Sequence, residues 1–502
     1  MRTFAKSWLF LACLCLLGLA ATPASAKDRI YWGNYDDPAF ALSWANLDGS
    51  GGADLPTPGV PKDGSQGFSL VPSTGTIYFA NYGESPFGAG GGAGTSLGFA
   101  RLDGSGGGLV ATPGGTVQGP HGTAIDPATG RIYWANETPG AIRFANLDGS
   151  GEGDLNTGTA TIDQPRGLAI DPATGRIYWA NHGGDFAISF ANLDGSGGAN
   201  LNTAPAPLDH SEGVAIAGGR IYWGSLCGAG EISYANLDGS GGGVLPTPGV
   251  TVTCPHGVAI DPSTQRIYWV DYASPGGDLE YANLDGSGGA QISTAGATTD
   301  GMSLPMLLKE PAAKTNPKLD GGAKPGAKLT CNPATWKDDV TAAELYQSPQ
   351  DVSQHWTENG KVLKGQSGNS FTPHEIGEFS CLDFATNAAG NTSKASAPIG
   401  VFRLAKVRRN LRKGTAKLVV KVPVAGFLKL KGRHIKTRAA GASGSLERKV
   451  KAGRTRLMIK PRGKARRRLA RKGKLKVKVW VSYRPMDAAK GTQRKVVRLK
   501  ER

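Results

Sequence analysis

Six polar or charged residues occupy one position of a repeated unit, immediately before a glycine that opens a short apolar segment. They are Gln66, His121, Arg166, Glu212, His256 and Asp300. If the fold brings them together, two imidazoles, a guanidinium and two carboxylates could bind an anion, chelate a metal ion or carry out acid–base catalysis. The simpler alternative is a solvated ring that holds only water.

The elements that must position these residues belong to a repeat that covers the first 300 residues. A Leu-Asp-Gly-Ser phrase recurs with its aspartate at 48, 103, 148, 194, 238 and 285, and an Ile-Tyr-aromatic phrase recurs with its tyrosine at 31, 78, 133, 178, 222 and 268. Spacings of 44 to 55 residues match the length of a four-stranded propeller blade. The sequence therefore predicts an all-β chain that begins with a six-bladed β-propeller over residues 27–305.

The two ends of the repeat predict how the ring closes. The first copy begins at its second strand, Arg29-Ile-Tyr-Trp32, and lacks the apolar strand that opens every other copy. The missing strand follows the sixth copy, as Gly301-Met-Ser-Leu304. We therefore expect this late segment to complete the first blade, which leaves no open sheet edge at the seam.

Position in the repeat also predicts position in space. The residue before each opening glycine should line the mouth of the central channel, with His121 opposite His256 and Arg166 opposite Asp300. The loops on this top face differ between copies, whereas the turns on the other face are nearly identical. Variable loops on a rigid frame are where binding usually takes place. We expect the top face to recognise a protein or glycan partner.

The repeated phrases Gly-Leu-Ala-Ile-Asp, Ile-Tyr-Trp-Ala-Asn and Asn-Leu-Asp-Gly-Ser resemble the YWTD repeats of low-density-lipoprotein-receptor-type propellers. The resemblance covers residues 29–305 and implies a six-bladed propeller used for protein recognition. This chain departs from the pattern at the fourth letter. That position holds Asn34, Asn81, Asn136, Asn181, Ser225 and Asp271.

A second resemblance suggests an alternative function. His121 and His256 each stand in a Pro-His-Gly phrase that is similar to phrases of streptogramin-lyase-like propellers. It implies a lactonase- or lyase-type enzyme in which these histidines act with a divalent metal such as Mg²⁺. That family has seven blades, and no nucleophile elbow, zinc motif or phosphate loop occurs in this chain. We therefore expect a binding protein rather than an enzyme, with no cofactor, and a divalent metal only under the enzyme alternative.

Residues 1–26 have the pattern of a signal peptide, with Arg2 and Lys6 before an apolar run and a small-residue cleavage site at Ala24-Ser25-Ala26. No later stretch approaches the ~20 apolar residues of a transmembrane span. We therefore predict a secreted protein, whose compartment permits disulfides. Cys227 and Cys254 fall on the same face of adjacent predicted blades, and we expect them to form one.

Two smaller β domains are expected beyond a linker at residues 306–316. Residues 317–400 carry two cysteines fifty residues apart with tryptophans between them, which fits a small disulfide-pinned sandwich. This stretch resembles bacterial immunoglobulin-like modules, and the likeness implies a Cys331–Cys381 bond. Residues 337–355 fit the pattern poorly and look like an insertion.

Residues 401–502 contain 36 Lys and Arg against only three acidic residues, Glu447, Asp487 and Glu501. The cations alternate with apolar residues, as in half-buried strands, so we expect a second β-sandwich with a short helix over residues 464–471. Such a surface attracts polyanions. We expect it to bind a polyanionic wall polymer or another extracellular anionic surface and to retain the protein electrostatically at the cell wall. Too few aromatics are present for sequence-specific nucleic-acid recognition.

Overall fold

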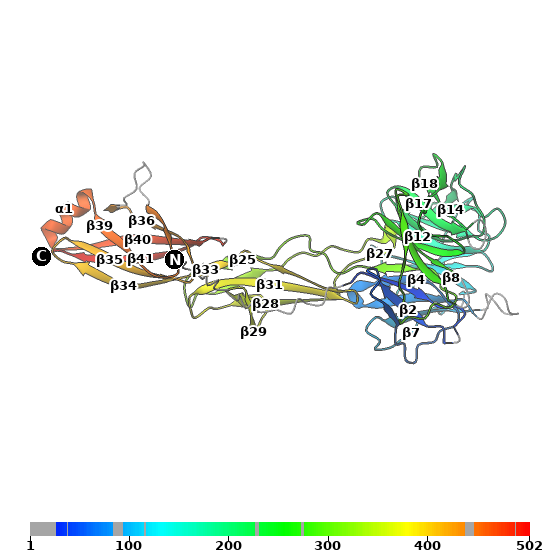
Figure 1. The fold of residues 1–502 in the computed structure, drawn as a ribbon, viewed down its shortest axis with the longest axis horizontal. Helices are drawn as coiled ribbons and strands as arrows, with labels where there is room; N and C mark the ends of the chain where they lie inside the picture. The colour runs from blue at the N-terminus through cyan, green and yellow to red at the C-terminus, as the bar shows by residue number, and fades with distance from the viewer. Residues whose placement is uncertain are drawn as a thin grey trace, which may run out of the picture.

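The computed structural model describes residues 27–37, 39–83, 94–114, 117–225, 230–272, 276–436, 446–486 and 488–502. The predicted signal peptide at 1–26 and Cys227 lie outside these ranges. The chain forms an elongated molecule, with a propeller at one end, a strand-rich middle module and a second β domain at the other end (Figure 1). Among the described residues, no helix is long and apolar enough to cross a membrane.

Six antiparallel sheets form the blades, and this confirms the predicted six-bladed propeller. Blade one contains β24 (Met306–Leu308), β1 (Arg29–Gly33), β2 (Leu42–Asn46) and β3 (Gly52–Asp54). Blade two contains β4 (Ser65–Val71), β5 (Thr76–Asn81), β6 (Ser96–Arg101) and β7 (Gly107–Leu109), and blade three contains β8 (Pro120–Asp126), β9 (Arg131–Asn136), β10 (Ala141–Asn146) and β11 (Gly153–Asp154). Blade four contains β12 (Pro165–Asp171), β13 (Arg176–Asn181), β14 (Ile188–Asn192) and β15 (Gly198–Asn200). Blade five contains β16 (Ser211–Ala217), β17 (Arg220–Ser225), β18 (Ile232–Asn236) and β19 (Gly242–Val244), and blade six contains β20 (Pro255–Asp261), β21 (Arg266–Asp271), β22 (Asp278–Asn283) and β23 (Gly289–Ile292).

The repeated aromatic residues hold neighbouring blades together. Five blades place a fully buried tryptophan on their second strand, and blade two places Phe79 there. Trp179 of blade four packs in one apolar cluster with Tyr133 of blade three. Because each large ring buries ~150–250 Å², this contact, repeated around the ring, supplies much of the propeller core.

The ring closes through a strand from the far end of the repeat, but in a different register from the one expected. Asn34 bridges Met302, and β1 then pairs with β24, with Tyr31 opposite Met306 and Arg29 opposite Leu308. Within the expected segment at 301–304, Met302 pairs with blade one through this single bridge, and the regular ladder begins at Met306. Residues 306–308, which we assigned to the linker, belong to the propeller. Their register is set by hydrogen-bond pairing with β1, and the position of the glycine at 301 does not predict it.

Leu304 takes the place that glycine holds in the other five innermost strands. A Cβ atom on Gly213 or on Gly257 would lie 2.6 Å from Leu304 Cδ2. The glycines therefore leave room at the axis for one large side chain, and Leu304 fills it.

The poorly fitting stretch at 337–355 extends from the middle module into the lower end of the propeller channel. It forms η2 (Thr341–Ala343) and β27 (Leu345–Tyr346), and β27 pairs in parallel with β24. The η2 turn contacts the innermost strands of blades four, five and six. We name residues 340–347 the plug. Because they leave the middle module and pack in the propeller, this part of the sequence does not match the pattern of a simple sandwich.

Two packed sheets make up the middle module. One contains β25 (Lys318–Gly321), β26 (Leu329–Asn332) and β30 (Ser370–Phe371), and the other contains β28 (Asp351–Glu358), β29 (Lys361–Ser367), β31 (Gly377–Asn387), β32 (Gly390–Ala395) and β33 (Ile399–Val401). The disulfide between Cys331 and Cys381, with an S–S distance of 2.09 Å, joins β26 to β31 across the sheets. Cys254 is a disulfide-bonded cysteine, and its pairing with Cys227 stays a prediction.

The described residues of the C-terminal domain form two four-stranded sheets and one helix. The first sheet contains β34 (Arg403–Asn410), β35 (Thr415–Val422), β39 (Gly453–Pro461) and β37 (Ile435–Lys436). The second contains β38 (Leu446–Val450), β36 (Gly426–Lys431), β40 (Lys474–Pro485) and β41 (Gly491–Lys500), and α1 (Gly463–Lys472) follows β39. Inward residues such as Leu418, Ile459 and Val479 are fully buried, and their cluster is continuous with the core around Trp356 of the middle module.

Replacing Leu307 by Ala tests the closing strand. Leu307 is fully buried beside β1, so the change should lower the free energy of unfolding of the propeller by about 2–5 kcal/mol. Urea denaturation followed by tryptophan fluorescence measures this loss. The control is Leu109→Ala, because Leu109 lies in the same propeller but is 46% exposed; it should change the stability by less than about 0.5 kcal/mol. Equal effects of the two substitutions would contradict the closure.

Replacing Glu344 by Gln tests the plug. Glu344 faces two channel cavities of about 10 Å³ each, and burial raises its pKa well above the usual value of 4.5. The folded protein therefore keeps this proton while the unfolded chain releases it, so the wild type loses stability as the pH rises above 4.5. We expect Glu344→Gln to match the wild type at acidic pH and to be increasingly more stable towards neutral pH.

Thermal or urea unfolding over a pH series measures this difference. The exposed Glu375→Gln is the control and should show no such trend. A stability difference for Glu344→Gln that does not change with pH would place this carboxyl outside the channel.

Candidate functional site

Five of the six predicted channel-mouth residues form a ring at the top of the channel. Gln66, His121, Arg166, Glu212 and His256 are each the second residue of an innermost strand. Asp300 is the exception, because the sixth ring position falls at Ser303 once the register is counted from Asn34. Ser303 Oγ accepts a hydrogen bond from the Gly33 amide at 3.2 Å. Asp300 lies in the preceding turn and is half-buried.

Glu212 is the centre of this ring and is fully buried. Its Oε1 accepts a hydrogen bond from Arg166 Nη1 and lies 2.8 Å from His182 Nδ1. Burial by itself would raise the pKa of Glu212, but the Arg166 charge and the His182 contact outweigh it and hold the pKa well below its usual range. The carboxylate therefore stays ionised inside the protein.

Arg166 pairs with two carboxylates of the site. Its Nη1 donates to Glu212 and its Nη2 donates to Glu137 Oε1 at 3.0 Å. The position opposite Arg166, where we expected Asp300, holds Ser303 instead. Arg166 thus neutralises one of two adjacent carboxylates and leaves the site with an excess of negative charge.

The two ring histidines face each other across the channel, as predicted. Their ring centroids are 6.2 Å apart and their planes are perpendicular. His121 Nε2 lies 3.9 Å from Glu212 Oε2, and His256 Nε2 lies 3.8 Å from the same oxygen. Burial lowers the pKa of both imidazoles, and the Arg166 charge lowers that of His121 further.

A second tier of side chains surrounds the ring, and the sequence reasoning did not include it among the candidate residues. Tyr82, Glu137, His182 and Tyr272 each directly follow the last residue of a second strand. The Tyr82 hydroxyl donates to Glu137 Oε2, and the Tyr272 ring lies 5.6 Å from that of His256. All four occupy the same position in the repeat, one residue after the end of the second strand. This shared position is the sequence signal that could have identified them.

Several buried polar atoms of the ring have no hydrogen-bond partner among the described residues. These are Gln66 Oε1, His121 Nδ1 and Glu212 Oε2. One atom from each of His121, Glu212 and His256 lies within 4.8 Å of the others. The ring therefore presents a compact set of nitrogen and oxygen donors whose polar groups the protein itself leaves unsatisfied.

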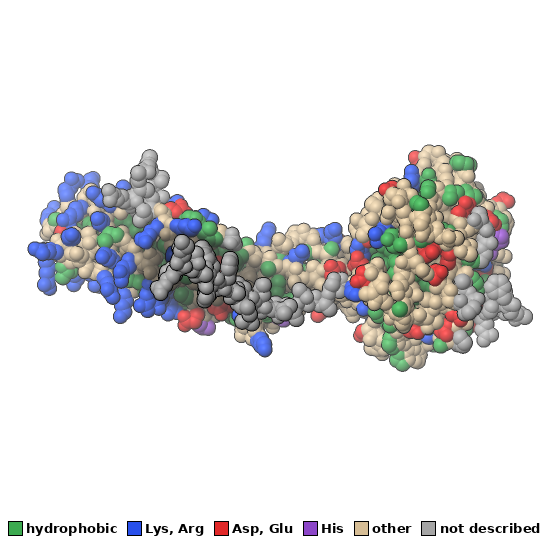
Figure 2. Space-filling model, viewed as in Figure 1, with side chains coloured by type: hydrophobic (Ala, Val, Ile, Leu, Met, Phe, Trp, Pro, Cys, Tyr) green, Lys and Arg blue, Asp and Glu red, His purple; other side chains and the backbone are tan. Residues whose placement is uncertain are grey.

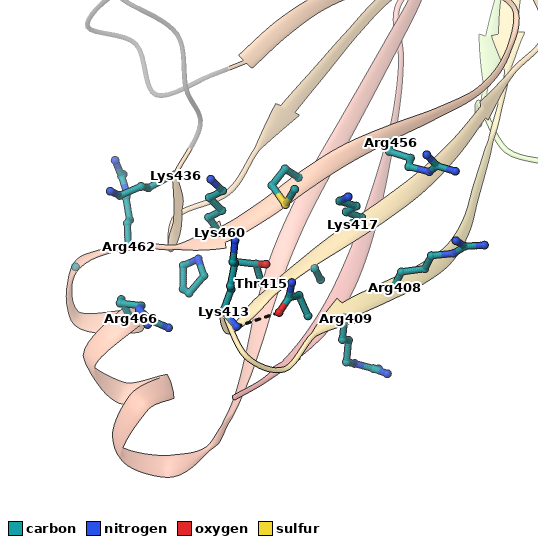
Figure 3. A pocket seen from close by; sticks show the side chains of 15 residues that line it. Arg408, Arg409, Lys413, Thr415, Lys417, Lys436, Arg456, Lys460, Arg462 and Arg466 are labelled. Carbon is teal, nitrogen blue, oxygen red and sulfur yellow. Dashed lines mark hydrogen bonds between the residues drawn. The ribbon is translucent and has the colours of Figure 1, made fainter. Parts of the chain in front are cut away.

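The C-terminal domain carries a second candidate site, which we name the basic groove. It has a volume of about 900 Å³, and nine of its fifteen lining residues are Lys or Arg, with no acidic residue among them. These cations are Arg408, Arg409, Lys413, Lys417, Lys436, Arg456, Lys460, Arg462 and Arg466. They come from β34, β35, β37 and β39, from the turn between β34 and β35, and from Arg462 and Arg466 at the start of α1 (Figure 3).

Few of the cations in this domain are neutralised. Among the described residues beyond Val401, ion pairs join Lys429 to Glu447 and Arg466 to Glu501, and Arg403 reaches Glu375 of the middle module. Figure 2 shows the remaining Lys and Arg side chains crowded over the end of the molecule that is far from the propeller. The positive potential of this end is therefore exposed to solvent.

No protein-family model and no curated protein matches this chain. Among solved structures, it is similar to a chain in the crystal structure of a nidogen/laminin complex, with 17% sequence identity and a TM-score of 0.45 over 56% of this chain and 98% of that one. It is also similar to a putative TolB from Agrobacterium tumefaciens, with 14% identity and a TM-score of 0.36 over 55% of this chain and 95% of that one. The six-bladed assignment therefore rests on the strand pairing of this chain.

Replacing Arg166 by Ala tests the electrostatic role of the ring. The change leaves two buried carboxylates without their cation, which should cost about 3–5 kcal/mol in the free energy of unfolding. The control is Arg101→Ala, since Arg101 is exposed in the same propeller; its loss should be at most about 1 kcal/mol. Denaturant unfolding of both variants measures the difference. A loss for Arg166→Ala that is no larger than the control would show that the ring contributes no net stability.

Proposed function

We propose that this chain is a binding protein that holds a polyanionic polymer of the cell envelope in its basic groove and presents the top face of its propeller to a protein or glycan partner. The observation that carries the proposal is the groove itself, in which nine cations line one surface without an acidic residue. Like charges that are fixed side by side repel each other, so an anion that spans several of them stabilises the surface.

The sheet that carries the groove keeps its cations in a regular array. In β35 and β39 the inward-facing Leu418, Leu457 and Ile459 are buried, whereas Lys417, Arg456 and Lys460 are exposed. Alternate residues of a strand lie roughly 7 Å apart, and neighbouring strands lie about 4.8 Å apart. A polymer with a charge on each repeating unit can contact several such positions at once, whereas a small anion contacts one or two.

The cationic surface continues beyond the groove. A second depression of about 590 Å³ is lined by Arg468, Lys472, Lys474, Lys476, Arg498 and Lys500. The helix α1 contributes to both depressions, through Arg466 on one side and Arg468 on the other. This continuity favours an extended ligand over a small one.

The rest of the molecule supports a role as a spacer between two binding ends. The plug ties the middle module to the propeller, and the core of the middle module is continuous with that of the basic domain. The Cys331–Cys381 disulfide and the predicted signal peptide favour an oxidising compartment, where wall polymers and acidic polysaccharides are the abundant polyanions. Attachment through the basic end would leave the variable loops of the propeller free at the other.

Charge reversal in the groove tests the proposal. The test variant replaces three exposed groove cations by Glu, at Lys417, Arg456 and Lys460. Binding to poly(glycerol phosphate), measured at several salt concentrations, should weaken at least about tenfold at low salt, and the slope of log affinity against log salt should fall by roughly three, about one for each cation removed.

The matched control reverses three exposed lysines of the other sheet and changes the net charge equally, at Lys431, Lys449 and Lys478. It should keep most of the affinity, because those side chains do not line the groove. Random-sequence duplex DNA, used as a second polyanion, should show the same order of variants. If both triple variants lose affinity to the same extent, the groove is not the binding site.

A further inference from the structure

Two neutral electron-pair donors meet an anionic oxygen at the mouth of the propeller channel. His256 Nδ1 lies 2.9 Å from the backbone oxygen of Met302. Because a carbonyl oxygen only accepts, this nitrogen must carry the proton, and the lone pair of the ring is then on Nε2. That Nε2 faces Glu212 Oε2 at 3.8 Å. A lone pair and a carboxylate oxygen that face each other repel unless something positive lies between them.

The opposite histidine approaches the same oxygen at a similar distance. His121 Nε2 lies 3.9 Å from Glu212 Oε2, which is too long for a hydrogen bond. The carboxylate oxygen itself is buried and has no hydrogen-bond partner among the described residues. Leaving a buried carboxylate oxygen unsatisfied costs free energy, so the site is arranged for a group that is absent from the protein chain.

The fourth side of the site is Gln66. A three-blade offset in a six-bladed ring places it across the channel from Glu212, just as it places His121 across from His256. Gln66 Oε1 is buried and has no partner among the described residues. Its amide oxygen can serve as a neutral ligand, which gives the ring two nitrogen and two oxygen donors.

The charge of the surroundings selects a cation. Arg166 is bound to both Glu212 and Glu137, so the buried set contains two carboxylates and one guanidinium. An anion placed in the ring would approach the free oxygen of Glu212. Imidazole nitrogens also favour Zn²⁺ and similar transition metals, whereas Mg²⁺ and Ca²⁺ prefer oxygen ligands alone.

We propose that the mouth of the propeller channel binds one divalent transition-metal ion, with Zn²⁺ the best fit, through His121 Nε2, His256 Nε2 and Glu212 Oε2, with Gln66 as the fourth ligand. The neighbouring residues act as supports. Met302 fixes the tautomer of His256, and Arg166 and His182 orient the Glu212 carboxylate through its other oxygen. Metal-binding histidines commonly donate their second ring N–H to a backbone carbonyl in this way.

The distances require a modest contraction on binding. Zinc bonds nitrogen and oxygen ligands at about 2.0–2.2 Å, which puts ligand atoms roughly 3.5 Å apart in tetrahedral geometry. The two distances from Glu212 Oε2 exceed this by a few tenths of an ångström. All three ligand atoms lie within 4.8 Å of one another, so binding requires both imidazoles to turn towards the ion.

Zinc titration of the full, untagged chain after removal of metals with a chelator tests the inference. Calorimetry should show one Zn²⁺ ion per chain that excess Mg²⁺ does not displace, and Co²⁺ in its place should give the visible absorption bands of a low-coordinate nitrogen–oxygen site. His256→Gln should weaken Zn²⁺ binding by roughly 100-fold or more, since loss of a mere supporting residue already costs about 10–100-fold. Gln66→Ala should produce a smaller loss.

His374→Gln is the matched control, because His374 is exposed on the middle module, and it should bind Zn²⁺ as the wild type does. If His256→Gln fails to fold, as judged by its thermal unfolding without metal, His121→Gln takes its place. Absence of Zn²⁺ binding by the folded wild type would overturn the inference. Binding that survives substitution of either ring histidine would overturn it as well, because the ion would then lie elsewhere.

Discussion

The close approach of six innermost strands around one axis is the constraint on which the propeller depends. A Cβ atom on Gly213 would lie 2.8 Å from Gly257 Cα, and one on Gly257 would lie 2.9 Å from Leu304 Cα, so five of the six strands carry glycine at this level. Leu304 is the one side chain that fits. Because the axis is filled here, the channel is divided into an upper compartment with the polar ring and a lower one that the plug closes.

The two compartments shift the pKa of a buried glutamate in opposite directions. In the upper one, Glu212 is ionised because Arg166 and His182 contact one of its oxygens, while its other oxygen faces the histidines. In the lower one, no described cation offsets the burial of Glu344, and burial raises its pKa. The same residue type is thus an anionic donor at one end of the channel and a neutral acid at the other, and the difference comes from the neighbouring charges alone.

The basic domain differs from the propeller channel because its charged side chains are exposed rather than buried. The apolar half of each strand supplies a core, with residues such as Val477 and Leu499 fully buried, so the outward positions are free to carry cations. Solvent weakens the mutual repulsion of these cations, and they therefore persist without acidic partners. A polyanion would replace the solvent ions, which is why binding there should depend steeply on salt.

The sequence by itself determined the number of blades, the alternating strands of the basic domain and five of the six ring residues, because each of these follows from a period that the residues repeat. His121 and His256 could be placed opposite each other by counting blades alone. The bond between Cys331 and Cys381 was expected from a resemblance, and the structure contains it. Only the tertiary structure decided that Ser303 and not Asp300 completes the ring, that Glu137 and His182 reach into it, and that residues 340–347 close the channel. The physical reason is that strand register and contacts between blades depend on partners that are distant in the chain. A local sequence pattern does not specify those partners.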